Sequence, residues 1–431
     1  MKLMVVGGGG REHAIIRCLK KNPEVTEIFA LPGNGGIAAD AACVPIGATD
    51  IDGIEKFAVE NKIDYAVVAP DDPLVLGCVD ALEKVGVPCF GPRANAAIIE
   101  GSKVFSKNLM KKYHIPTAGY AVFDNMEAAL RYLDTAPIPT VIKADGLALG
   151  KGVIIAQTRQ EAKDAVKSMM ADKVFGHSGD HIVIEEFLTG PEVSVLAFTD
   201  GKVVKPMVSS MDHKRIGDHD QGLNTGGMGT VAPNPYYTEE IAAQCMEEIF
   251  LPTIAAMNAE GRTFRGCLYF GLMLTPKGPK VIEYNCRFGD PETQVVLPLL
   301  EGDLLHIMEA CTNGTLADED VKFSDGAAAC VILASGGYPV AYEKGKPISG
   351  LVDGQLPDEE NVTVYHSGTA LTEDGQLVTN GGRVLGVTAT GPRLTNALSH
   401  AYEAAEKIHF DKLHKRSDIG LRALKALAEK Q

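Results

Sequence analysis

VIKADGLALGKGVII, residues 141–155, is the most informative segment of this 431-residue sequence. Its centre almost matches a Walker phosphate loop, but Asp145 stands where the first glycine belongs and Gly152 where the Ser or Thr belongs. A Walker loop leads from a strand into a helix, whereas this one has β-branched runs on both sides, at residues 141–142 and 153–155. We therefore expect an antiparallel hairpin with a long glycine-rich tip.

The composition limits the class of protein. A chain of 431 residues has room for two to four domains with buried cores. Its 41 Lys and Arg against 56 Asp and Glu give a formal charge of −15, which argues against a nucleic-acid partner and favours small substrates. The nine cysteines are scattered and form no CxxC pair, so neither a disulfide framework nor a zinc site is expected.

The amino terminus, MKLMVVGGGG, lacks the apolar run of a signal peptide, and no segment reaches the length of a membrane span. We therefore expect a soluble, cytoplasmic protein with no membrane partner.

The first hundred residues alternate short β runs with helical patterns, as in a doubly wound α/β domain with a parallel sheet. Strands are predicted at residues 3–6, 27–30, 65–69 and 89–90, with helices at 11–21 and 50–61. After residue 92 the spacing changes to a helix over 102–113 and shorter strands, as in a mixed α+β body. The last part, from residue 326, has strand candidates at 328–334, 362–367 and 383–389 and a closing amphipathic helix.

A cluster of glycines, residues 7–10, separates the first strand from the first helix. Backbone N–H groups at such a turn can hold an anion at the positive end of the helix. Three interpretations stay open: a dinucleotide site, a turn that only packs helix on sheet, and a site for a single phosphate. The third glycine of GxGxxG is missing, and residues 31–36 supply no acidic ribose ligand, so a single phosphate on a small substrate fits best.

Two lysines accompany the glycine-rich hairpin. Lys103 opens the predicted helix over residues 102–113, and Lys143 lies in the strand that enters the hairpin. Their side chains can reach phosphate oxygens from different sides. The candidate ligands of a nucleotide's phosphates are Lys103, Lys143, Gly146, Gly150, Lys151 and Gly152.

A buried strand over residues 182–188 carries two glutamates near its end. A carboxylate or an exposed backbone group there can hydrogen-bond an adenine amino group, and an acid a few residues later can accept from ribose hydroxyls. Glu185, Glu186 and Leu188 are the candidates for adenine, and Glu192 is the candidate for ribose. Solvated surface charge is the alternative reading of such a pair.

The segment VIEYNCRFGDPET, residues 281–293, places Glu283, Asn285 and Arg287 on one face of a strand. Oxygen ligands from Glu283 and Asn285 suit a hard cation such as Mg²⁺, with phosphate oxygens and water completing its shell. Arg287 can hold a substrate carboxylate or a transferring phosphoryl group. The alternative is an edge strand with a polar face.

These elements, in this order, resemble the ATP-grasp ligases. Further motifs are similar to those of the phosphoribosylamine–glycine ligase family of purine biosynthesis, over essentially the whole chain: GGGREHA (8–14), PGN (32–34), ADGLALGKGV (144–153), MDHKRIGDHDQGLNTGGMG (211–229), EYNCRFGDPETQ (283–294), GGYP (336–339) and GGRVLGVTA (381–389).

The resemblance implies four structural units. They are a Rossmann-like substrate domain over residues 1–100, an ATP-grasp core over 101–123 and 190–325, a lid over 124–189, and a small mixed β/α domain over 326–431. It also implies ATP as co-substrate, Mg²⁺ or Mn²⁺ as the metal, glycine and 5-phosphoribosylamine as substrates, and a monomer or weak homodimer.

The implied chemistry transfers the γ-phosphoryl group of ATP to glycine. The resulting glycyl phosphate is attacked by the amine of phosphoribosylamine, which gives glycinamide ribonucleotide, ADP and phosphate. Cationic Lys103, Lys143 and Arg287 are suited to this transfer, which needs positioning and charge neutralisation and no covalent nucleophile on the protein. Cys286 and the other cysteines therefore need no catalytic role.

The resemblance also assigns substrate contacts. Asp212 is expected to hold an amine and Lys214 an anionic group, while His213 is either a proton shuttle or a hydrogen-bonding partner. With Arg287, Asp212 and Lys214 form the catalytic set. The expected substrate-binding residues are Gly9, Gly10, Arg11, Glu12, Asn34, Asp71, Arg215, Asn224, Thr225, Gly226, Asp290 and Glu292.

The sequence departs from the family pattern at two places, and three alternative functions remain. Residues 269–274 offer no carboxylate for a second metal ion, and residues 69–71 read Ala-Pro-Asp where Gly-Pro-Glu is expected, so Asp71 can take a ribose hydroxyl with a shorter reach. The alternatives are an ATP-grasp ligase for another ribonucleotide or amino acid, a nucleotide-binding regulatory protein without turnover, and a nicotinamide dehydrogenase. ADP release that depends on both glycine and phosphoribosylamine separates the first reading from all three.

Overall fold

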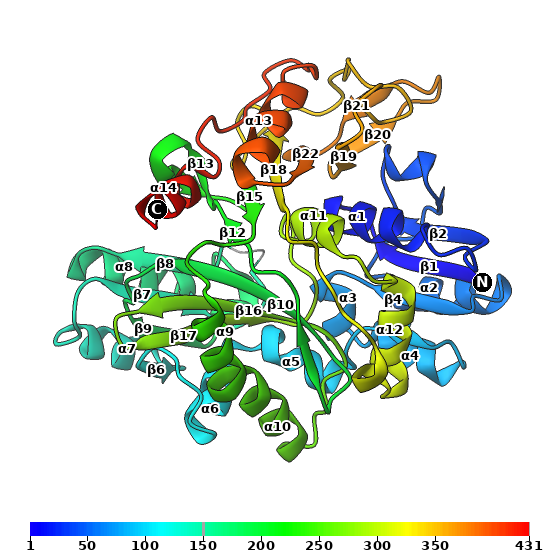
Figure 1. Ribbon diagram of the computed structural model, residues 1–431. Helices are drawn as coiled ribbons and strands as arrows, with labels where there is room; N and C mark the ends of the chain where they lie inside the picture. Colours follow the sequence, from blue (N-terminus) through cyan, green and yellow to red (C-terminus); the bar gives the residue numbers. More distant parts are fainter. Residues whose placement is uncertain (149–150, 431) are drawn as a thin grey trace.

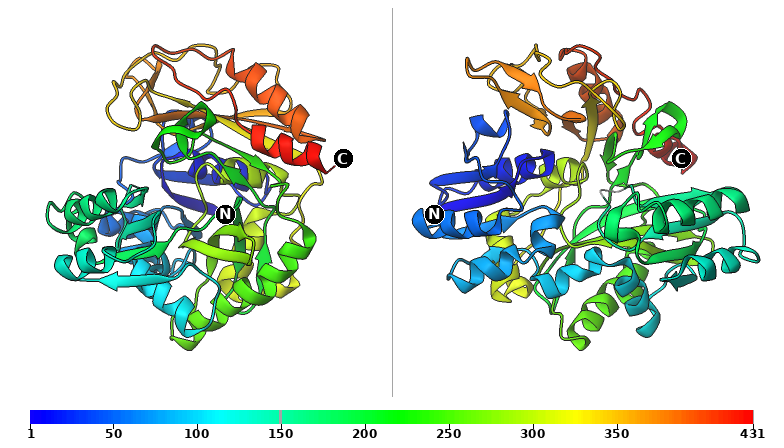
Figure 2. Two further views of the ribbon diagram at one scale, coloured as in Figure 1. Left: turned by 90° about the vertical axis from the view of Figure 1, so that its left-hand side faces the viewer. Right: turned by 180° about the vertical axis from the view of Figure 1, so that it is seen from behind.

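The computed structural model of this protein describes residues 1–148 and 151–430. Four sheets of four or five strands and two short hairpins form the described chain. The N-terminal sheet and the sheet of the lid lie at opposite ends of the molecule, with a central sheet between them and the C-terminal domain above (Figures 1 and 2).

The N-terminal domain is a doubly wound parallel sheet, as predicted. Its strands, in the order β3-β2-β1-β4-β5, are β1 (Lys2–Gly7), β2 (Glu27–Pro32), β3 (Ala42–Cys43), β4 (Tyr65–Val68) and β5 (Cys89–Phe90). Its helices are α1 (Gly10–Leu19), α2 (Ile51–Glu60), α3 (Asp71–Val75), α4 (Cys78–Lys84) and α5 (Ala94–Gly101). Only β3, which is two residues long, has no counterpart among the predicted strands.

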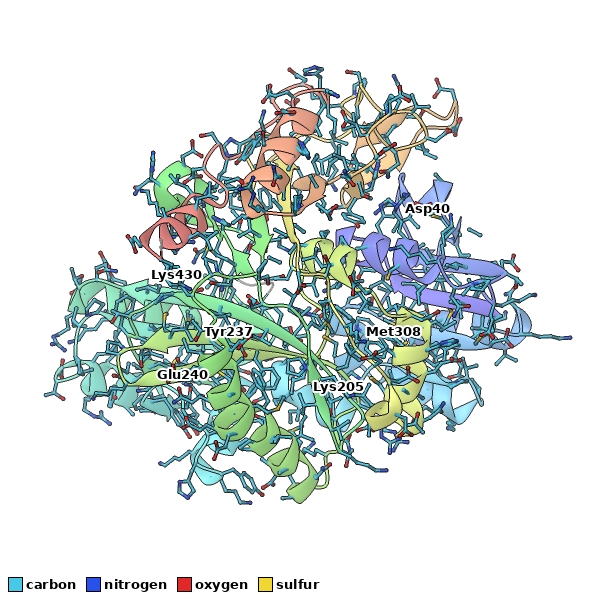
Figure 3. The ribbon with its side chains drawn as sticks, viewed as in Figure 1. Asp40, Lys205, Tyr237, Glu240, Met308 and Lys430 are labelled. Carbon is cyan, nitrogen blue, oxygen red and sulfur yellow. The ribbon has the colours of Figure 1, made fainter. Side chains whose placement is uncertain are left out.

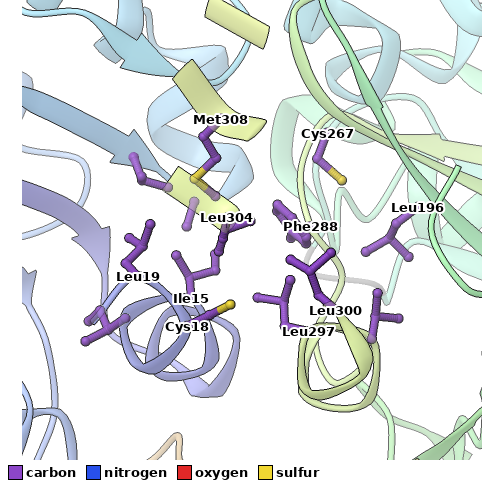
Figure 4. Close-up of a cluster of buried hydrophobic side chains, with 14 of the residues drawn as sticks. Ile15, Cys18, Leu19, Leu196, Cys267, Phe288, Leu297, Leu300, Leu304 and Met308 are labelled. Atoms are coloured by element: carbon purple, nitrogen blue, oxygen red, sulfur yellow. The ribbon is translucent and has the colours of Figure 1, made fainter. Parts of the chain in front are cut away.

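Alternate residues of β1 face two different cores. Leu3 and Val5 pack in the same cluster as α1 and helix α12 (Leu304–Asn313), whereas Met4 and Val6 belong to a second cluster with α2 and α4. Figure 4 shows the first cluster, in which side chains of α1 meet those of α12. A parallel sheet covered on both faces explains why its strands are continuous hydrophobic runs.

The hairpin predicted from residues 141–155 is present in a second sheet. Strands β7 (Thr140–Ala144) and β8 (Val153–Ala156) are antiparallel, and β9 (Ile182–Glu186) and β6 (Tyr120–Phe123) complete the order β6-β9-β7-β8. Helices α7 (Met126–Leu133) and α8 (Arg159–Met170) pack on it and share its separate small core. This lid therefore has a core of its own.

The central sheet carries the strand with Glu283. Its strands, in the order β11-β10-β16-β17, are β10 (Glu192–Thr199), β11 (Val204–Pro206), β16 (Gly266–Thr275) and β17 (Gly278–Asn285). The helices around it are α6 (Lys103–Lys112), α9 (Glu239–Cys245), α10 (Leu251–Ala259) and α12, whereas the short α11 (Thr293–Val296) that follows β17 packs on α1. The register between β16 and β17 shifts beside Ile282, since Gly271 faces Glu283 but Leu272 faces Val281. Such a bulge re-aims side chains, so Val281 and Tyr284 both reach the core while Glu283 faces away from it.

The C-terminal domain takes strands from both sides of residue 326. Its sheet has the order β12-β15-β18-β22-β19, formed by β12 (Met211–Asp212), β15 (Gly229–Ala232), β18 (Ala327–Ala334), β19 (Val362–His366) and β22 (Arg383–Gly391). Hairpins β13 (Arg215–Gly217) with β14 (Gln221–Asn224) and β20 (Thr369–Leu371) with β21 (Leu377–Thr379), and helices α13 (Leu394–Ala405) and α14 (Leu421–Glu429), complete the domain. The motif at residues 211–229 is thus built into this sheet, and the domain boundaries stay a prediction.

Short 3-10 and π segments connect several of these elements. They are η1 (Ile37–Ala39), η2 (Gly176–Gly179), η3 (Asp218–Asp220), η4 (Met246–Phe250), η5 (Leu297–Leu299) and η6 (Leu316–Asp318). Within the described chain, no helix has the length and apolar character that crossing a membrane requires.

Candidate active site

Glu283, near the end of β17, is surrounded by positive charge. Burial alone would raise the pKa of its carboxyl group, but the nearby charges of Lys214, Lys143, Lys103 and Arg287 outweigh burial and hold that pKa below its usual range. The group is therefore an ionised carboxylate at neutral pH. Across the described residues, no hydrogen bond occupies the side chain of Glu283 or Asn285. An ionised carboxylate and an amide oxygen without protein partners are suitable ligands for Mg²⁺ or Mn²⁺.

Lys103 and Asp145 fasten the lid to helix α6. Ser102 caps α6 by accepting a hydrogen bond from the Phe105 N–H, and its hydroxyl donates to Asp145 at 2.9 Å. Asp145 also accepts from the Val104 N–H at 2.8 Å, and Lys103 Nζ donates to the Gly146 carbonyl at 3.0 Å. Asp145, which stands in place of the first Walker glycine, therefore holds the base of the glycine-rich tip against α6.

The glycine-rich tip leaves no space for side chains at two positions. A Cβ atom on Gly146 would lie 2.6 Å from the Ser178 hydroxyl, and one on Gly152 would lie 2.7 Å from the Ala148 Cβ. Lys151 is exposed beside them. Gly150, also predicted to contact phosphate, lies outside the described residues.

Glu185 is buried between two ammonium groups. Its carboxylate oxygens lie 3.1 Å from Lys143 Nζ and 3.4 Å from Lys107 Nζ, and Lys143 also donates to the Ile282 carbonyl. Burial lowers the pKa of Lys107 to about 8, although the charge of Glu185 opposes this effect. The carboxylate of Glu185 is therefore ion-paired, and its backbone carbonyl accepts from the Thr140 hydroxyl at 3.0 Å.

The other residues predicted to bind the nucleoside are more exposed. Glu186 accepts a hydrogen bond from the Gly119 N–H at 3.1 Å, and Leu188 is half-buried. Glu192, at the start of β10, is exposed, and its carboxylate lies 3.7 Å from Lys214 Nζ. The charge of Glu192 is the main cause that raises the pKa of Lys214.

Asp212 and Glu292 form an acid pair. Burial, and then the charge of Glu292, raise the pKa of Asp212, and burial raises the pKa of Glu292. Because the charge of each opposes ionisation of the other, the two groups together bind a proton more readily than an isolated carboxyl group does. The pair can therefore hold an ammonium group or accept a proton from one.

A buried relay of hydroxyl groups supports Glu292. Tyr269 of β16 donates a hydrogen bond to the Glu292 carboxylate at 3.0 Å, and its hydroxyl also lies 2.7 Å from that of Ser194 on β10. Both neighbours are buried. Residues 269–274, which supply no acidic metal ligand, thus include Tyr269, which orients Glu292.

Replacing Tyr269 by Phe is expected to lower kcat about tenfold. Because the hydrogen bond from Tyr269 lowers the pKa of Glu292, its loss should also move the acidic limb of the pH–rate profile to higher pH. The measurement is kcat from pH 5 to pH 9. Tyr65→Phe is the matched control. The Tyr65 hydroxyl is also buried and hydrogen-bonded, but its partner is Thr312, at 2.7 Å, and not a member of the acid pair. An unchanged profile in Tyr269→Phe would show that Tyr269 only packs.

His213 is a hydrogen-bonding residue of the C-terminal domain. It is buried, its Nδ1 lies 3.0 Å from the Gly229 carbonyl, and its Nε2 accepts from the Gly420 N–H at 3.1 Å. Burial lowers its pKa to about 4. With both ring nitrogens engaged, it serves as a structural partner and does not act as a proton shuttle.

The buried neutral His213 is expected to weaken the fold in acid. Between pH 6.5 and about pH 4 the unfolded chain binds a proton at this residue that the folded chain does not bind, so the free energy of unfolding decreases as the pH falls. In the wild type, burial of His213 should make the free energy of unfolding about 2 kcal/mol lower at pH 5 than at pH 7, and His213→Gln should remove this contribution. Urea titrations at the two pH values measure it. The exposed His400, replaced by Gln, should keep the wild-type pH dependence. Equal slopes in all three proteins would refute this account.

The glycine turn at the start of α1 meets the segment that follows β17. Arg11 donates to the Phe288 carbonyl at 3.2 Å and to Glu12 at 2.8 Å, and its N–H donates to Asp290 at 3.3 Å. Glu12 in turn accepts from the Gly9 N–H and completes the cap of the helix that begins at Gly10. Arg11, Glu12 and Asp290 are thus brought together.

Asn34 is fully occupied by the protein. Its amide group donates to the carbonyls of Gly8 and His366 at 3.0 and 2.7 Å, and its side-chain oxygen accepts from the N–H groups of Gly36 and Ile37. The side chain therefore shapes the turn beside the glycine cluster, and a ligand there would meet backbone groups.

Arg287 forms an ion pair with Glu100, which lies outside the motif at residues 283–294. Its guanidinium donates to Glu100 at 2.9 Å and lies 3.9 Å from Asp71. Burial raises the pKa of Glu100, while the charge of Arg287 opposes this effect. Glu100 also accepts from the Cys286 N–H, so it fixes the end of β17 from α5.

Arg383 of β22 joins the C-terminal domain to the site. It donates to the carbonyls of Gly226 and Asp290 at 2.9 and 3.0 Å. The neighbouring Thr225 donates to the Lys214 carbonyl at 2.7 Å. Arg383 therefore holds the loop at residues 224–226 and the segment after β17 in one arrangement.

Of the predicted residues, the structure thus brings the charges of Lys103, Lys143, Lys214 and Arg287 to Glu283. Arg215 donates to the Gly222 carbonyl and pairs with Asn224 within the hairpin β13–β14, and its own carbonyl accepts from Arg416 at 3.1 Å. Residues that the sequence interpretation missed are Lys107, Glu100, Tyr269, Ser194 and Arg383. Of these, only Lys107 could be inferred from neighbouring sequence, because it lies one helical turn after Lys103 and on the same face of α6.

The chain matches three family descriptions in succession. These are "Phosphoribosylglycinamide synthetase, N domain" over residues 1–100, the ATP-grasp (A) domain of the same family over 101–293, and its C domain over 328–422. A curated phosphoribosylamine–glycine ligase from Caldanaerobacter subterraneus is 47% identical over 97% of this chain and 99% of its own.

Solved structures agree with this match. The crystal structure of a phosphoribosylamine–glycine ligase from Thermotoga maritima is 35% identical, covers 97% of this chain and 100% of its own, and superposes with a TM-score of 0.84. The biotin carboxylase domain of a 2-oxoglutarate carboxylase from Hydrogenobacter thermophilus, solved with MgADP and bicarbonate, is 15% identical over 96% of this chain and 91% of its own, with a TM-score of 0.74. The second likeness concerns the fold alone.

Proposed function

This chain belongs to the phosphoribosylglycinamide synthetase family, and from that premise we propose which of its residues bind and activate the substrates. It is an ATP-dependent ligase of purine biosynthesis that joins glycine to 5-phosphoribosylamine and forms glycinamide ribonucleotide. The observation that carries the assignment of residues is the ionised Glu283 among Lys103, Lys143, Lys214 and Arg287.

ATP is proposed to bind between the lid and the central sheet. Lys103, Lys143 and the backbone of the glycine-rich tip would contact its phosphates, and the end of β9, from Glu185 to Leu188, would contact the base. Glu192 would accept from the ribose hydroxyls. Glu283 and Asn285 would hold Mg²⁺ or Mn²⁺, which supplies positive charge to the phosphate tail when bound.

The first step is proposed to activate glycine. A carboxylate resists attack by an amine, so one of its oxygens first attacks the γ-phosphorus of ATP, and the bond from that phosphorus to the β-γ bridging oxygen breaks. Lys103, Lys143 and Arg287 balance the charge that spreads over the transferring group. The products are ADP and glycyl phosphate.

The second step is proposed to form the amide bond. The nitrogen of phosphoribosylamine attacks the carbonyl carbon of glycyl phosphate, and the carbon–oxygen bond to phosphate breaks. The proton that the nitrogen loses passes to the pair of Asp212 and Glu292, whose raised pKa values suit proton uptake. Lys214 would balance the departing phosphate.

The sugar phosphate is proposed to bind at the start of α1. The N–H groups of Gly9, Gly10 and Arg11 lie at the positive end of this helix, and the turn shaped by Asn34 lies beside them. The N–H groups of Gly9 and Arg11 donate to Glu12 and Asp290, so a bound phosphate would replace these two carboxylates as their acceptor. Asp71, near Arg287, can accept from a ribose hydroxyl. Further contacts are proposed for Glu12, Arg215, Asn224, Thr225, Gly226 and Asp290.

Two properties of the whole protein are also proposed. All nine cysteines are unpaired, which suits the reducing cytoplasm. The residues assigned above come from one chain, so a monomer or a weak homodimer would suffice for activity.

Isotope tracing tests the proposed route. When glycine carries ¹⁸O in its carboxylate, one labelled oxygen is expected in the released phosphate, because that oxygen bridges carbon and phosphorus in glycyl phosphate. Release of ADP should require glycine and phosphoribosylamine together. Unlabelled phosphate formed alongside amide would rule out the acyl-phosphate route, and ADP formed with another amino acid at the same rate would rule out the assigned substrate.

A further inference from the structure

A cavity of about 420 Å³ lies between α1 and the C-terminal domain. Its walls come from α1, from residues 297–298 that follow α11, and from the strands β19 and β22. None of the residues assigned above to ATP, metal, glycine or the sugar phosphate lines it. Pockets of about 300–1,000 Å³ are typical of small-molecule sites.

The side of this cavity formed by α1 is basic. Arg17, Lys20 and Lys21 line it at the C-terminal end of the helix, and the carboxylate of Asp40 lies among them. Asp40, labelled in Figure 3, is already neutralised, since it lies 3.1 Å from Arg17, 3.0 Å from Lys20 and 2.8 Å from His13. Lys21 forms no ion pair within the described part of the chain. Positive charge is therefore available to a ligand.

The opposite side offers hydroxyl and amide groups. They belong to Asn361, Thr363, Tyr365 and Thr390, and Glu360 adds one carboxylate at the same side. Thr388 also lines this side, but its hydroxyl donates to the Gln294 carbonyl. Ala14, Cys18, Leu297 and Pro298 supply apolar surface, and two of these, Cys18 and Leu297, belong to the core cluster drawn in Figure 4. Ammonium and guanidinium groups with hydroxyl donors suit a phosphate group, and the apolar surface suits a compact ring.

We propose that this cavity is a second ligand site, which binds a phosphomonoester about the size of a nucleoside monophosphate. The phosphate contacts Lys21 and draws Arg17 and Lys20 partly away from Asp40. The rest of the ligand lies against the surface formed by Leu297 and Pro298.

A chain of hydrogen bonds leads from this cavity to the glycine turn. The Asp40 carboxylate accepts from His13 Nε2, and His13 Nδ1 accepts from the His366 N–H at 2.9 Å. The His366 carbonyl accepts from the Asn34 amide at 2.7 Å. A ligand that changes the partners of Asp40 therefore acts on Asn34, which shapes the turn beside Gly8.

This connection has a kinetic consequence that rests on the proposed place of the sugar phosphate. Occupation of the cavity changes the KM for phosphoribosylamine more than the KM for ATP, because the chain of hydrogen bonds ends at the turn beside the glycine cluster.

Binding of AMP to the full-length protein tests the second site. Calorimetric titration is carried out with a non-hydrolysable ATP analogue at saturation, so that the ATP site is filled. We expect AMP to bind still, and Lys21→Glu to weaken this binding at least about tenfold. Lys84→Glu is the matched control, since Lys84, like Lys21, is an exposed lysine at the C-terminal end of a helix, here α4, and should leave AMP binding unchanged.

The outcomes separate the two proposals. Absence of AMP binding in the wild-type protein, or equal binding by Lys21→Glu, would overturn the second site. Binding that depends on Lys21 but leaves the KM for phosphoribosylamine unchanged would uphold the site and overturn the sugar-phosphate position at the glycine turn. Without AMP, Lys21→Glu should retain the wild-type kcat.

Discussion

Glu283→Gln is expected to lower kcat about a thousandfold. The change keeps the size of the side chain but removes the negative charge that Lys103, Lys143, Lys214 and Arg287 surround. It also replaces a charged metal ligand by a neutral one, so the concentration of Mg²⁺ needed for half-maximal activity should rise. ADP release measured over a range of Mg²⁺ concentrations gives both quantities.

The control for this substitution is Glu60→Gln, at an exposed position near the end of α2. It should leave both kcat and the Mg²⁺ requirement unchanged. A Glu283→Gln protein that is folded, as judged by circular dichroism, and retains a tenth or more of the wild-type kcat would show that this carboxylate is not central to phosphoryl transfer.

Arg287→Met is expected to destabilise the protein by about 3–5 kcal/mol and to abolish most of its activity. The side chain of Arg287 is 18% exposed and that of Glu100 is 7% exposed, so the substitution leaves a buried carboxylate without its partner. Met has a similar length, so the loss reflects charge more than packing. Urea unfolding and initial rates of ADP release measure the two effects.

A double substitution separates the structural role of Arg287 from its catalytic role. Arg287→Met combined with Glu100→Gln removes both charges, and it should recover most of the lost stability, because a neutral amide costs less to bury than an unpaired carboxylate. Activity should stay low, since the cation near the transferring group is still missing. Recovery of activity together with stability would show that Arg287 acts only through the fold.

The sequence predicted those parts of the fold that depend on local patterns. The runs at residues 3–6 and 65–69 form parallel strands, and the β-branched residues around the glycine-rich tip form the antiparallel hairpin β7–β8. The spacing of Glu283 and Asn285 placed both on the face of β17 that does not enter the core. Each prediction uses residues that are close together in the chain, where the period of a strand is directly visible.

The partners of these residues were not predictable in the same way. Glu100 meets Arg287 across 187 positions of sequence, and Arg383 meets Gly226 across 157. No local pattern distinguishes Glu100 or Arg383 from the many charged residues of the surface. The recruitment of β12 and β15 into the C-terminal sheet was missed for the same reason, because strand pairing depends on which edges meet in space.

By itself, the sequence determined the class of each domain, the glycine-rich hairpin and the order of the ligand-bearing motifs, since these follow from hydrophobic periodicity and from residue types at short spacing. Only the tertiary structure decided the charge state of Glu283, the ion pairing of Glu185 and the structural use of His213 and Asn34. A pKa, and the availability of a side chain for a ligand, depend on burial and on charges from distant segments, and these exist only once the chain has folded.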